Sequence, residues 1–428
     1  MRRFLSAACL IAWGLGVAAF SAHASNTHAH KTDKKAAAKA NARKSAPEKA
    51  TATPSANAEP AGQAEARLIE VYKLIGSGLH REALEKASLL VREHPNFQLA
   101  HLVYGDLLAS RVRPIQNVGD VQNVPAGPAS NTLADLRLES ARRIAALREP
   151  VPAGLVPSQF QALSMVSKHA IAVDASKSRL YLFENTPNGL KQIGNYYITV
   201  GKAGTSKLVE GDQRTPLGVY YITSSLDPRN LKEFYGAGAL PISYPNVLDS
   251  KRGKTGSGIW LHGTPPNQFA RAPQASDGCV VLANPDLLHI INTVAVRTTP
   301  VVIAPQLQWV PPQKARAEGK SFEDALHAWR TAKSSGKTEQ VLKYYTQDFS
   351  SGGKNLSQWL PTLQAEMQKF QGRSIELKDV SFLHWNDTAE TMVVTFGEVA
   401  KGLKFGLTKR QYWVRENNQW KIFFEGTI

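Results

Sequence analysis

The chain has 428 residues, 43% of them hydrophobic, which is enough to bury two or three separate cores. It carries 51 Lys and Arg against 35 Asp and Glu, and its formal net charge of +16 favours a polyanionic partner. Its two cysteines, Cys9 and Cys279, exclude a disulfide framework and a zinc site built of cysteines. We expect neither a metal site nor a cofactor.

The first 24 residues have the pattern of a cleavable secretory signal peptide. Two arginines precede an uncharged apolar run at 4–20, and Ala22-His23-Ala24 offers small residues where signal peptidase cuts. The run is short for a membrane-spanning helix, although a membrane anchor is the alternative. Cleavage before Ser25 would leave Cys279 as the only thiol. Export argues against nucleic acid as the partner and favours an anionic cell wall or membrane surface.

The next segment, 25–63, is predicted to be a disordered linker rich in alanine and lysine. Residues 31–49 hold seven Lys or Arg and two acidic residues, with almost no large apolar side chain. Such a segment serves either as a solvated spacer or as a tether that follows an anionic surface.

A helical domain is predicted over 64–160. The stretch "REALEKASLLVREHPNFQLAHLVYGDLL" has apolar residues at three- and four-residue spacing, interrupted at Pro95, and "NTLADLRLESARRIAALRE" gives another amphipathic helix. The first stretch resembles one tetratricopeptide unit. Because a single unit cannot bury its own apolar face, we predict a small helical domain and not a repeat array.

The periodicity then changes to short strands punctuated by Gly and Pro, which predicts a mainly β domain over 168–304. "HAIAVDASKSRLYLF" indicates a hairpin, and "QIGNYYITVG", "TPLGVYYITSS", "GIWLHGT" and "TPVVIAP" indicate further strands. "NPDLLHIINTV" predicts a helix that opens at Asn284.

The last block, 318–428, reads as three helices followed by an antiparallel sheet, an α+β plan in which Asn417 and Asn418 form a tight turn. No acid/base constellation is evident in it. Asp348 and His384 are lone polar residues, expected at the surface or with satisfied hydrogen bonds. The tryptophans have the spacing of core residues, with stacking on sugar as the alternative for one or two of them.

Cys279 is the candidate nucleophile, in the stretch "WLHGTPPNQFARAPQASDGCVVL" that begins at Trp260. An ordinary free thiol is mostly protonated at neutral pH, so it needs a base, and His262 is the candidate. Gly263 and Gly278 allow tight turns, and backbone N–H groups around Gly278 could bind an oxyanion. The alternative is a buried, inert thiol with a core histidine.

This β block resembles the L,D-transpeptidase (YkuD-type) catalytic domain of bacterial cell-wall enzymes. That family carries a His-Gly pair, a loop, and a Ser/Thr-His-Gly-Cys segment, which match "HGTPP" and "SDGC" here, and "GDQRTPLGVYYI" matches its Thr-Pro-x-Gly strand. The resemblance implies Cys279 as nucleophile, His262 as proton acceptor and donor, and Ser276, Asp277 and Gly278 as residues that shape the substrate-binding loop.

Two positions depart from the family pattern. Asp277 replaces the histidine before the glycine, and its charge would oppose thiolate formation unless it only caps its own turn. Val281 replaces an arginine associated with gripping a substrate carboxylate. The donor peptide is therefore left open.

The last block resembles the NTF2-like domain found after the catalytic domain in the subgroup that contains cell-shape-determining L,D-carboxypeptidases. Together the resemblances imply a periplasmic transpeptidase that acts on peptidoglycan stem peptides through a thioester, releases D-alanine and cross-links an amine on another stem or on a wall-anchored protein. Hydrolysis of the thioester, which would make the protein an L,D-carboxypeptidase, is the first alternative. A non-catalytic wall-binding scaffold is the second.

Overall fold

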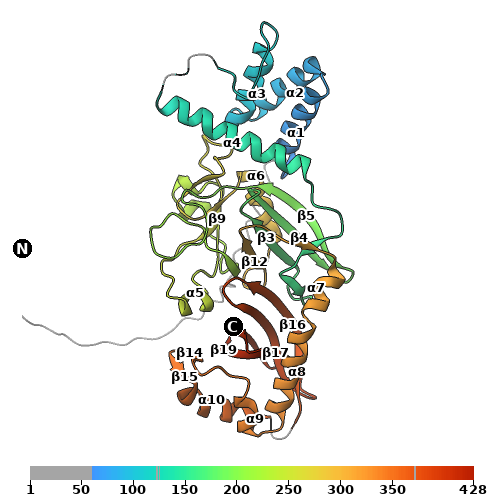
Figure 1. Cartoon of the computed structure of the whole chain (residues 1–428), viewed down its shortest axis with the longest axis vertical. Coiled ribbons are helices and arrows are strands. Elements are labelled where there is room, and N and C mark those ends of the chain that lie inside the picture. The colour runs from blue at the N-terminus through green and yellow to red at the C-terminus, as the bar shows by residue number, and fades with distance from the viewer. Residues whose placement is uncertain (1–59, 122–123, 125, 371–372) are drawn as a thin grey trace, which may run out of the picture. The chain divides into compact units, whose positions relative to one another are not determined.

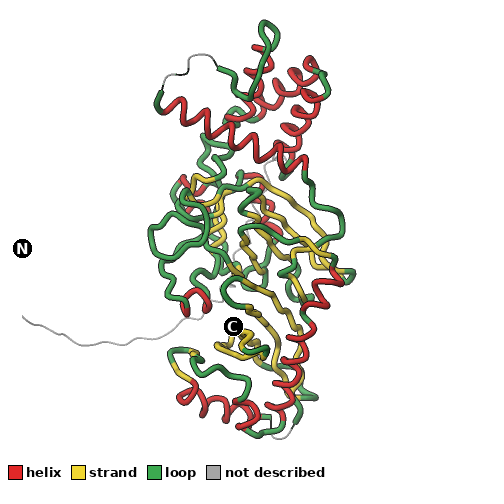
Figure 2. Tube along the Cα trace, viewed as in Figure 1, coloured by secondary structure: helices red, strands yellow, loops and turns green. Residues whose placement is uncertain are grey.

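The computed structural model describes residues 60–121, 124, 126–370 and 373–428. The predicted signal peptide and nearly all of the predicted linker lie outside these residues. Within them, no helix is both long enough and apolar enough to cross a membrane. Figure 2 shows a block of helices, a block dominated by strands and a block with both, which confirms the predicted fold class.

The helical block is built from four helices (Figure 1). They are α1 (Gln63–Gly76), α2 (His80–Glu93), α3 (Gln98–Ala109) and α4 (Pro128–Arg148). Pro95 separates α2 from α3, as its place in the sequence predicts. Apolar side chains at helical spacing, among them Leu68 and Leu90, form the core of this block. The N–H of Gly62 donates to Asp286 over 2.7 Å, so the last residues of the predicted linker contact the middle block.

The middle block contains a five-stranded sheet in the order β5-β4-β3-β12-β7 and a three-stranded sheet in the order β11-β9-β8. The strands of the larger sheet are β3 (His169–Asp174), β4 (Arg179–Thr186), β5 (Gly189–Tyr197), β7 (Gly218–Tyr221) and β12 (Pro300–Ala304). Those of the smaller sheet are β8 (Ala239–Pro241), β9 (Trp260–His262) and β11 (Val280–Val281). The connections hold the short elements β6 (Val200–Gly201), β10 (Gln274–Ser276), η1 (Pro228–Asn230), η2 (Glu233–Tyr235) and α5 (Val247–Lys251).

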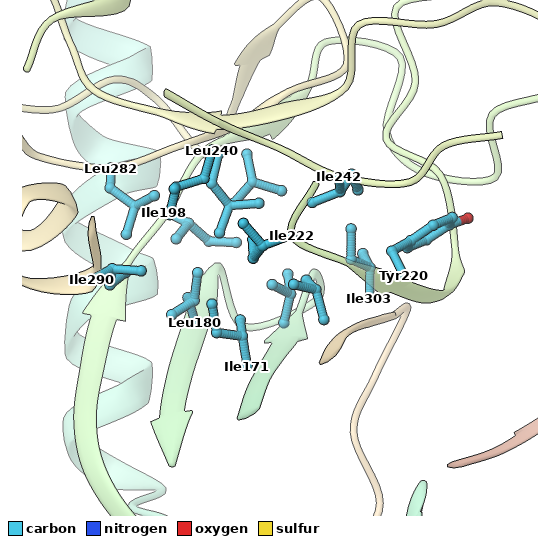
Figure 3. Close-up of a cluster of buried hydrophobic side chains, with 14 of the residues drawn as sticks. Ile171, Leu180, Ile198, Tyr220, Ile222, Leu240, Ile242, Leu282, Ile290 and Ile303 are labelled. Carbon is cyan, nitrogen blue, oxygen red and sulfur yellow. The ribbon is translucent and has the colours of Figure 1, made fainter. Parts of the chain in front are cut away.

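A single apolar core joins the two sheets of the middle block (Figure 3). Ile171 and Leu180 from the larger sheet are buried with Leu240 from the smaller one, and Ile290 from α6 (Asn284–Thr293) closes one side. Each of these four side chains has no exposed surface. Because dense cores resist local displacement, this packing fixes the smaller sheet, on which the candidate site lies.

The C-terminal block has the predicted helices followed by long antiparallel strands. They are α8 (Lys320–Ser334), α9 (Thr338–Leu342), α10 (Leu356–Lys369), β16 (Ile375–Asn386), β17 (Glu390–Ala400), β18 (Leu407–Glu416) and β19 (Gln419–Thr427), with the small hairpin β14 (Ser350–Ser351) and β15 (Lys354–Asn355). Asn417 and Asn418 both have positive φ, 49° and 62°, and form the predicted turn between β18 and β19. Trp329 and Trp413 are fully buried, as expected of core residues.

The segment before the middle block does not belong to the helical block, to which the sequence assigned it. β2 (Phe160–Ala162) is the edge strand of the C-terminal sheet, whose order is β19-β18-β17-β16-β2. β1 (Val156–Pro157) pairs with β13 (Trp309–Val310), just before α7 (Pro312–Glu318). These strands are too short to show a periodic pattern, and their pairing covers an edge that β16 would otherwise expose. The two ends of the middle block are thus held together.

Candidate active site

Two neighbouring parallel strands bring Cys279 and His262 together. In the register of β9 and β11, Val280 pairs with Leu261 and Val281 with His262. Leu261 and Val280 point into the core, with no exposed surface. Since side chains alternate along a strand, Cys279 and His262 lie on the opposite face, with Cys279 opposite Trp260 and so two residues from His262 in the register. The predicted pair therefore shares one face at the edge of the smaller sheet.

His262 is held as a neutral imidazole with a defined tautomer. Its Nδ1 lies 2.7 Å from the carbonyl oxygen of Gly263. Because a carbonyl only accepts, Nδ1 carries the hydrogen and Nε2 is left with its lone pair. Burial lowers the pKa of His262 to about 4, against the opposing effect of the Gly263 carbonyl. At neutral pH the ring is thus a base ready to accept a proton at Nε2.

The Cys279 thiol is also neutral. Its side chain is half-buried, and Sγ–H donates to the carbonyl oxygen of Gly258 over 3.5 Å. Burial raises the pKa of Cys279 above its usual range, and the charge of Asp277 adds to the rise, while the backbone N–H of Trp260 works against it. Within the described residues, Sγ forms no hydrogen bond with His262. The resting site is a neutral pair and not a thiolate–imidazolium pair.

The loop before the cysteine is fixed by Ser276. Its hydroxyl donates to the Cys279 carbonyl over 2.6 Å and accepts from the Gly278 N–H over 3.1 Å. Gly278 has φ 127°, and a Cβ there would lie 2.9 Å from the carbonyl oxygen of Arg214, so a side chain would not fit. Thr215 supports the same turn by donating to the Gly278 carbonyl over 2.9 Å. Of the backbone N–H groups around Gly278 and Cys279 that the sequence suggested as oxyanion donors, that of Gly278 is therefore already engaged by Ser276.

Asp277 points away from its own turn. Its carboxylate accepts from Lys202 over 2.9 Å and from Gln213 over 3.3 Å, and it is solvent-exposed. The turn is capped by Ser276, so the alternative reading of Asp277 as a cap of its own loop is wrong. Its negative charge still opposes thiolate formation at Cys279, as the sequence predicted.

Aromatic residues of the segment before β8 cover His262. The ring centroid of Phe234 lies 5.8 Å from that of His262, and the ring centroid of Tyr235 lies 5.1 Å from it. The Gly263 N–H donates to the Tyr235 carbonyl over 3.0 Å. In the connection 226–254, only the part around η2 covers the site in this way, whereas the rest contains β8 and α5 and belongs to the packed block.

Asn284 fastens this aromatic cover, although the sequence indicated it only as a helix start. Its side-chain oxygen accepts from the N–H groups of Ala237 and Thr264, over 2.9 and 3.2 Å, and its Nδ2 donates to the Thr264 carbonyl over 2.8 Å. A Cβ on Gly263 would lie 2.0 Å from that oxygen. Gly263 is thus needed for close approach and not for a left-handed turn.

The loop between His262 and Cys279 is anchored in the helical block. Phe269 is buried in the helical core and stacks on Phe97, with ring centroids 4.2 Å apart. Its N–H donates to the Asn96 carbonyl over 3.0 Å, and the Asn96 side chain donates to the Pro266 carbonyl over 2.9 Å. A lone aromatic residue in a polar loop is the signal that could have indicated this contact.

The helical block is further joined to the middle block through buried ion pairs. Glu65 accepts two hydrogen bonds from Arg179, over 2.8 and 2.9 Å, and pairs with Arg143 over 2.8 Å. Arg143 also pairs with Glu139 and lies 4.0 Å from the ring centroid of Tyr197. Removing one of these charged residues would leave its partner as an uncompensated buried charge. The contact between the two blocks therefore requires these residues in this arrangement.

The C-terminal block holds a charged cluster that sequence reading missed. Lys333 lies 2.7 Å from Glu398 and 3.0 Å from Glu366, and Lys409 lies 2.6 Å from Glu425 and 3.0 Å from Glu398. The lysines are almost fully buried, and each is paired within the cluster. Charged residues at inward-facing positions of the predicted strands are the sequence signal that could have indicated this cluster. Of the two solitary residues, Asp348 pairs with Lys251 and His384 lies 3.4 Å from Glu390.

Comparison with known proteins agrees with this architecture. Residues 168–303 match the YkuD family, the L,D-transpeptidase catalytic domain, and residues 321–426 match the Cds6 C-terminal NTF2-like domain. The chain therefore carries an L,D-transpeptidase-family catalytic domain followed by an NTF2-like domain.

Solved structures resemble larger parts of the chain. The structure of Bd1075 from Bdellovibrio bacteriovorus is 24% identical, with a TM-score of 0.54 over 64% of this chain and 98% of that one. The helical cell shape determining protein Pgp2 from Campylobacter jejuni is 22% identical, with a TM-score of 0.49 over 60% of this chain and 91% of that one. At this identity the likeness to Bd1075 shows the fold alone. No curated protein matches the sequence.

Proposed function

We propose that the protein is a periplasmic cysteine enzyme that acts on peptidoglycan stem peptides as an L,D-transpeptidase. The observation that carries the proposal is the neutral Cys279–His262 pair on adjacent parallel strands, in a domain of the L,D-transpeptidase family. A thiol beside an imidazole with a free Nε2 suits acyl transfer, because the imidazole can accept the thiol proton as the sulfur attacks.

In the first step, Nε2 of His262 accepts the thiol proton as Sγ of Cys279 attacks the carbonyl carbon of diaminopimelate. The bond from that carbon to the nitrogen of D-alanine breaks, and His262 returns the proton to the leaving nitrogen. The product is a thioester on Cys279. The low pKa of His262 makes its protonated form a strong acid, which favours the return of the proton.

In the second step an amine attacks the thioester, loses a proton through His262 and forms a cross-link, while Cys279 leaves as a thiol. Water competes at about 55 M, so transfer requires an enclosed site. Phe234 and Tyr235 over His262 favour transfer, because they restrict water at the base.

Hydrolysis to the tripeptide is the second candidate. It is favoured by Val281, which stands where the family resemblance places an arginine, and by the half-buried Cys279. Residues Ser276, Asp277 and Gly278 serve both outcomes, since they set the loop against which the peptide binds.

The test is incubation of purified protein with a tetrapeptide-bearing disaccharide, with products read by mass. Dimers with a diaminopimelate–diaminopimelate bond are the expected result. Tripeptide alone, at high acceptor concentration, would replace transfer by hydrolysis. A thiol-reactive carbapenem that fails to add to folded protein, together with no turnover, would favour the wall-binding scaffold instead.

A further inference from the structure

Val281 stands where the family resemblance places an arginine that binds a substrate carboxylate. The backbone of Val281 is paired with a neighbouring segment on each side. It pairs with His262 on β9, and it exchanges two hydrogen bonds of 3.0 Å with Thr199. Its side chain is 2% exposed. The carboxylate of a stem peptide therefore needs a different cation in this protein.

Arg271 lies on the loop that joins His262 to Cys279. Its guanidinium carbon is 4.4 Å from the ring centroid of Phe234, which is itself 5.8 Å from that of His262. The loop backbone at this point is held firmly, because the Arg271 carbonyl accepts from Tyr197 over 2.8 Å and from Thr199 over 3.1 Å. Arg271 thus lies on the His262 side of the site.

The charge of Arg271 is not neutralised by a neighbour. Among the described residues, its guanidinium forms no ion pair or hydrogen bond, and its Nε is buried without a partner. The two cations that lower the pKa of Cys279 are Arg271 and Lys207, but Lys207 pairs with Asp212 over 2.8 Å. Asp277, the nearest anion on the same loop, is paired with Lys202. An unsatisfied buried donor is costly unless a ligand completes it.

Space for a ligand adjoins Arg271. A cavity of about 800 Å³ is lined by Arg271, Phe234 and Ala275 from the middle block and by Gln98 and Asp135 from the helical block. Two further acidic residues line it, Glu139, which pairs with Arg143, and Glu233, which is exposed. The cavity therefore offers one unpaired cation next to the layer that covers His262.

We propose that Arg271 binds the carboxylate of the leaving amino acid, in place of the arginine absent at position 281. The proposal rests on the function proposed above. The nitrogen released from the acyl carbon must lie near His262 to receive its proton, and its carboxylate carbon is only two bonds away. The contacts of Phe234 with Arg271 and His262 place the guanidinium within about 10 Å of the imidazole centre. The leaving amino acid can bridge this distance, with its nitrogen hydrogen-bonded to His262 and its carboxylate hydrogen-bonded to Arg271.

The first test does not depend on the natural substrate. Alkylation of Cys279 is measured with iodoacetate, an anion, and with neutral iodoacetamide, in wild type, Arg271→Gln, Arg271→Lys and the matched control Arg229→Gln. Arg229 lies in η1, just before the aromatic cover, and is exposed and paired with Asp227. The ratio of the two rates cancels any change in thiol ionisation. We expect it to fall about two- to fivefold in Arg271→Gln and to stay unchanged in the control. An unchanged ratio in Arg271→Gln overturns the proposal.

The second test uses the tetrapeptide and its C-terminal amide. Wild type should prefer the free acid about 10- to 100-fold in kcat/KM, mainly through KM, and Arg271→Gln should lose this preference. Arg271→Lys should retain part of it. Equal loss on both peptides would mean that Arg271 is merely structural.

A tetrapeptide with lysine in place of diaminopimelate lacks the side-chain carboxylate. If Arg271→Gln abolishes discrimination between lysine and diaminopimelate but not between acid and amide, the assignment to the leaving group is overturned. Absence of turnover on every peptide would overturn the proposed function and this choice of ligand, while a changed alkylation ratio would still establish an anion site beside the thiol.

Discussion

Replacing Phe269 by alanine should uncouple the active-site loop from the helical block. Phe269 is 7% exposed, stacks on Phe97 at 4.2 Å and meets His94 edge-on at 5.4 Å. Truncation of a buried phenylalanine costs about 3–5 kcal/mol. We expect the loop to undock while both blocks stay folded, so much of this cost should appear as a shift from docked to undocked loop of roughly a hundredfold or more.

The assay compares turnover of stem peptide with thermal unfolding and with iodoacetamide alkylation of Cys279. In Phe269→Ala, turnover should fall at least about tenfold because Arg271 and Ser276 lose their fixed places, while alkylation persists. Leu68→Ala is the matched control. It removes a 1% exposed side chain from α1 in the same core at about 2–5 kcal/mol, and the ring contacts of Phe269 lie elsewhere. Phe269→Leu should restore most of the turnover.

Loss of stability and turnover in the same proportion in both variants would refute a specific anchoring role of Phe269. In that case the loop depends only on the general integrity of the helical core. That role is equally refuted if Phe269→Ala has normal turnover, because the anchor would then be unnecessary for the geometry of the site.

Three further predictions concern single groups. Cys279→Ala should abolish the acyl-enzyme seen by intact-protein mass while leaving thermal unfolding nearly unchanged, and an adduct that persists would identify another nucleophile. Because the pKa of His262 is about 4, kcat/KM should fall at acid pH with a midpoint near that value, and this fall should be absent in His262→Asn. Alkylation of Cys279 in His262→Asn should recover as the pH rises. A midpoint near 6.5 in the wild type contradicts the prediction. Burial raises the pKa of Asp286 to about 7 from its ordinary 3.8, so the folded state binds this proton more tightly than the unfolded state. Its contribution to stability is full below about pH 4 and is lost as pH rises through 7. Asp286→Asn keeps an acceptor for the Gly62 N–H and should be more stable than wild type at pH 8 but not at pH 4. A difference in unfolding stability between the two proteins that does not grow with pH rules this out.

The sequence was most informative where structure is local. Two short apolar runs joined by a turn predicted β3 and β4, which are buried on both faces, and apolar alternation predicted the four long C-terminal strands. The spacing of His262 and Cys279 indicated the pair through family resemblance, and their parallel register explains how residues 17 positions apart meet.

The sequence was least informative where distant segments complete one another. β2 has three residues and no period of its own, and it is a strand only because β16 offers an edge. The place of Arg271 beside His262 depends on Phe234, which comes from a different loop. The Lys333 cluster likewise forms only when α8 packs on the sheet. A local pattern does not give the partners in such contacts.

The neutral state of the resting thiol has a consequence for its chemical survival. Oxidants and disulfides react with thiolates far faster than with thiols, so a cysteine that keeps its proton until a peptide arrives is slow to form a sulfenic acid or a mixed disulfide. Cys279 has no second cysteine among the described residues to rescue it by forming an internal disulfide. If Cys279 is the proposed nucleophile, its raised pKa would therefore lengthen the working life of the protein under oxidising conditions.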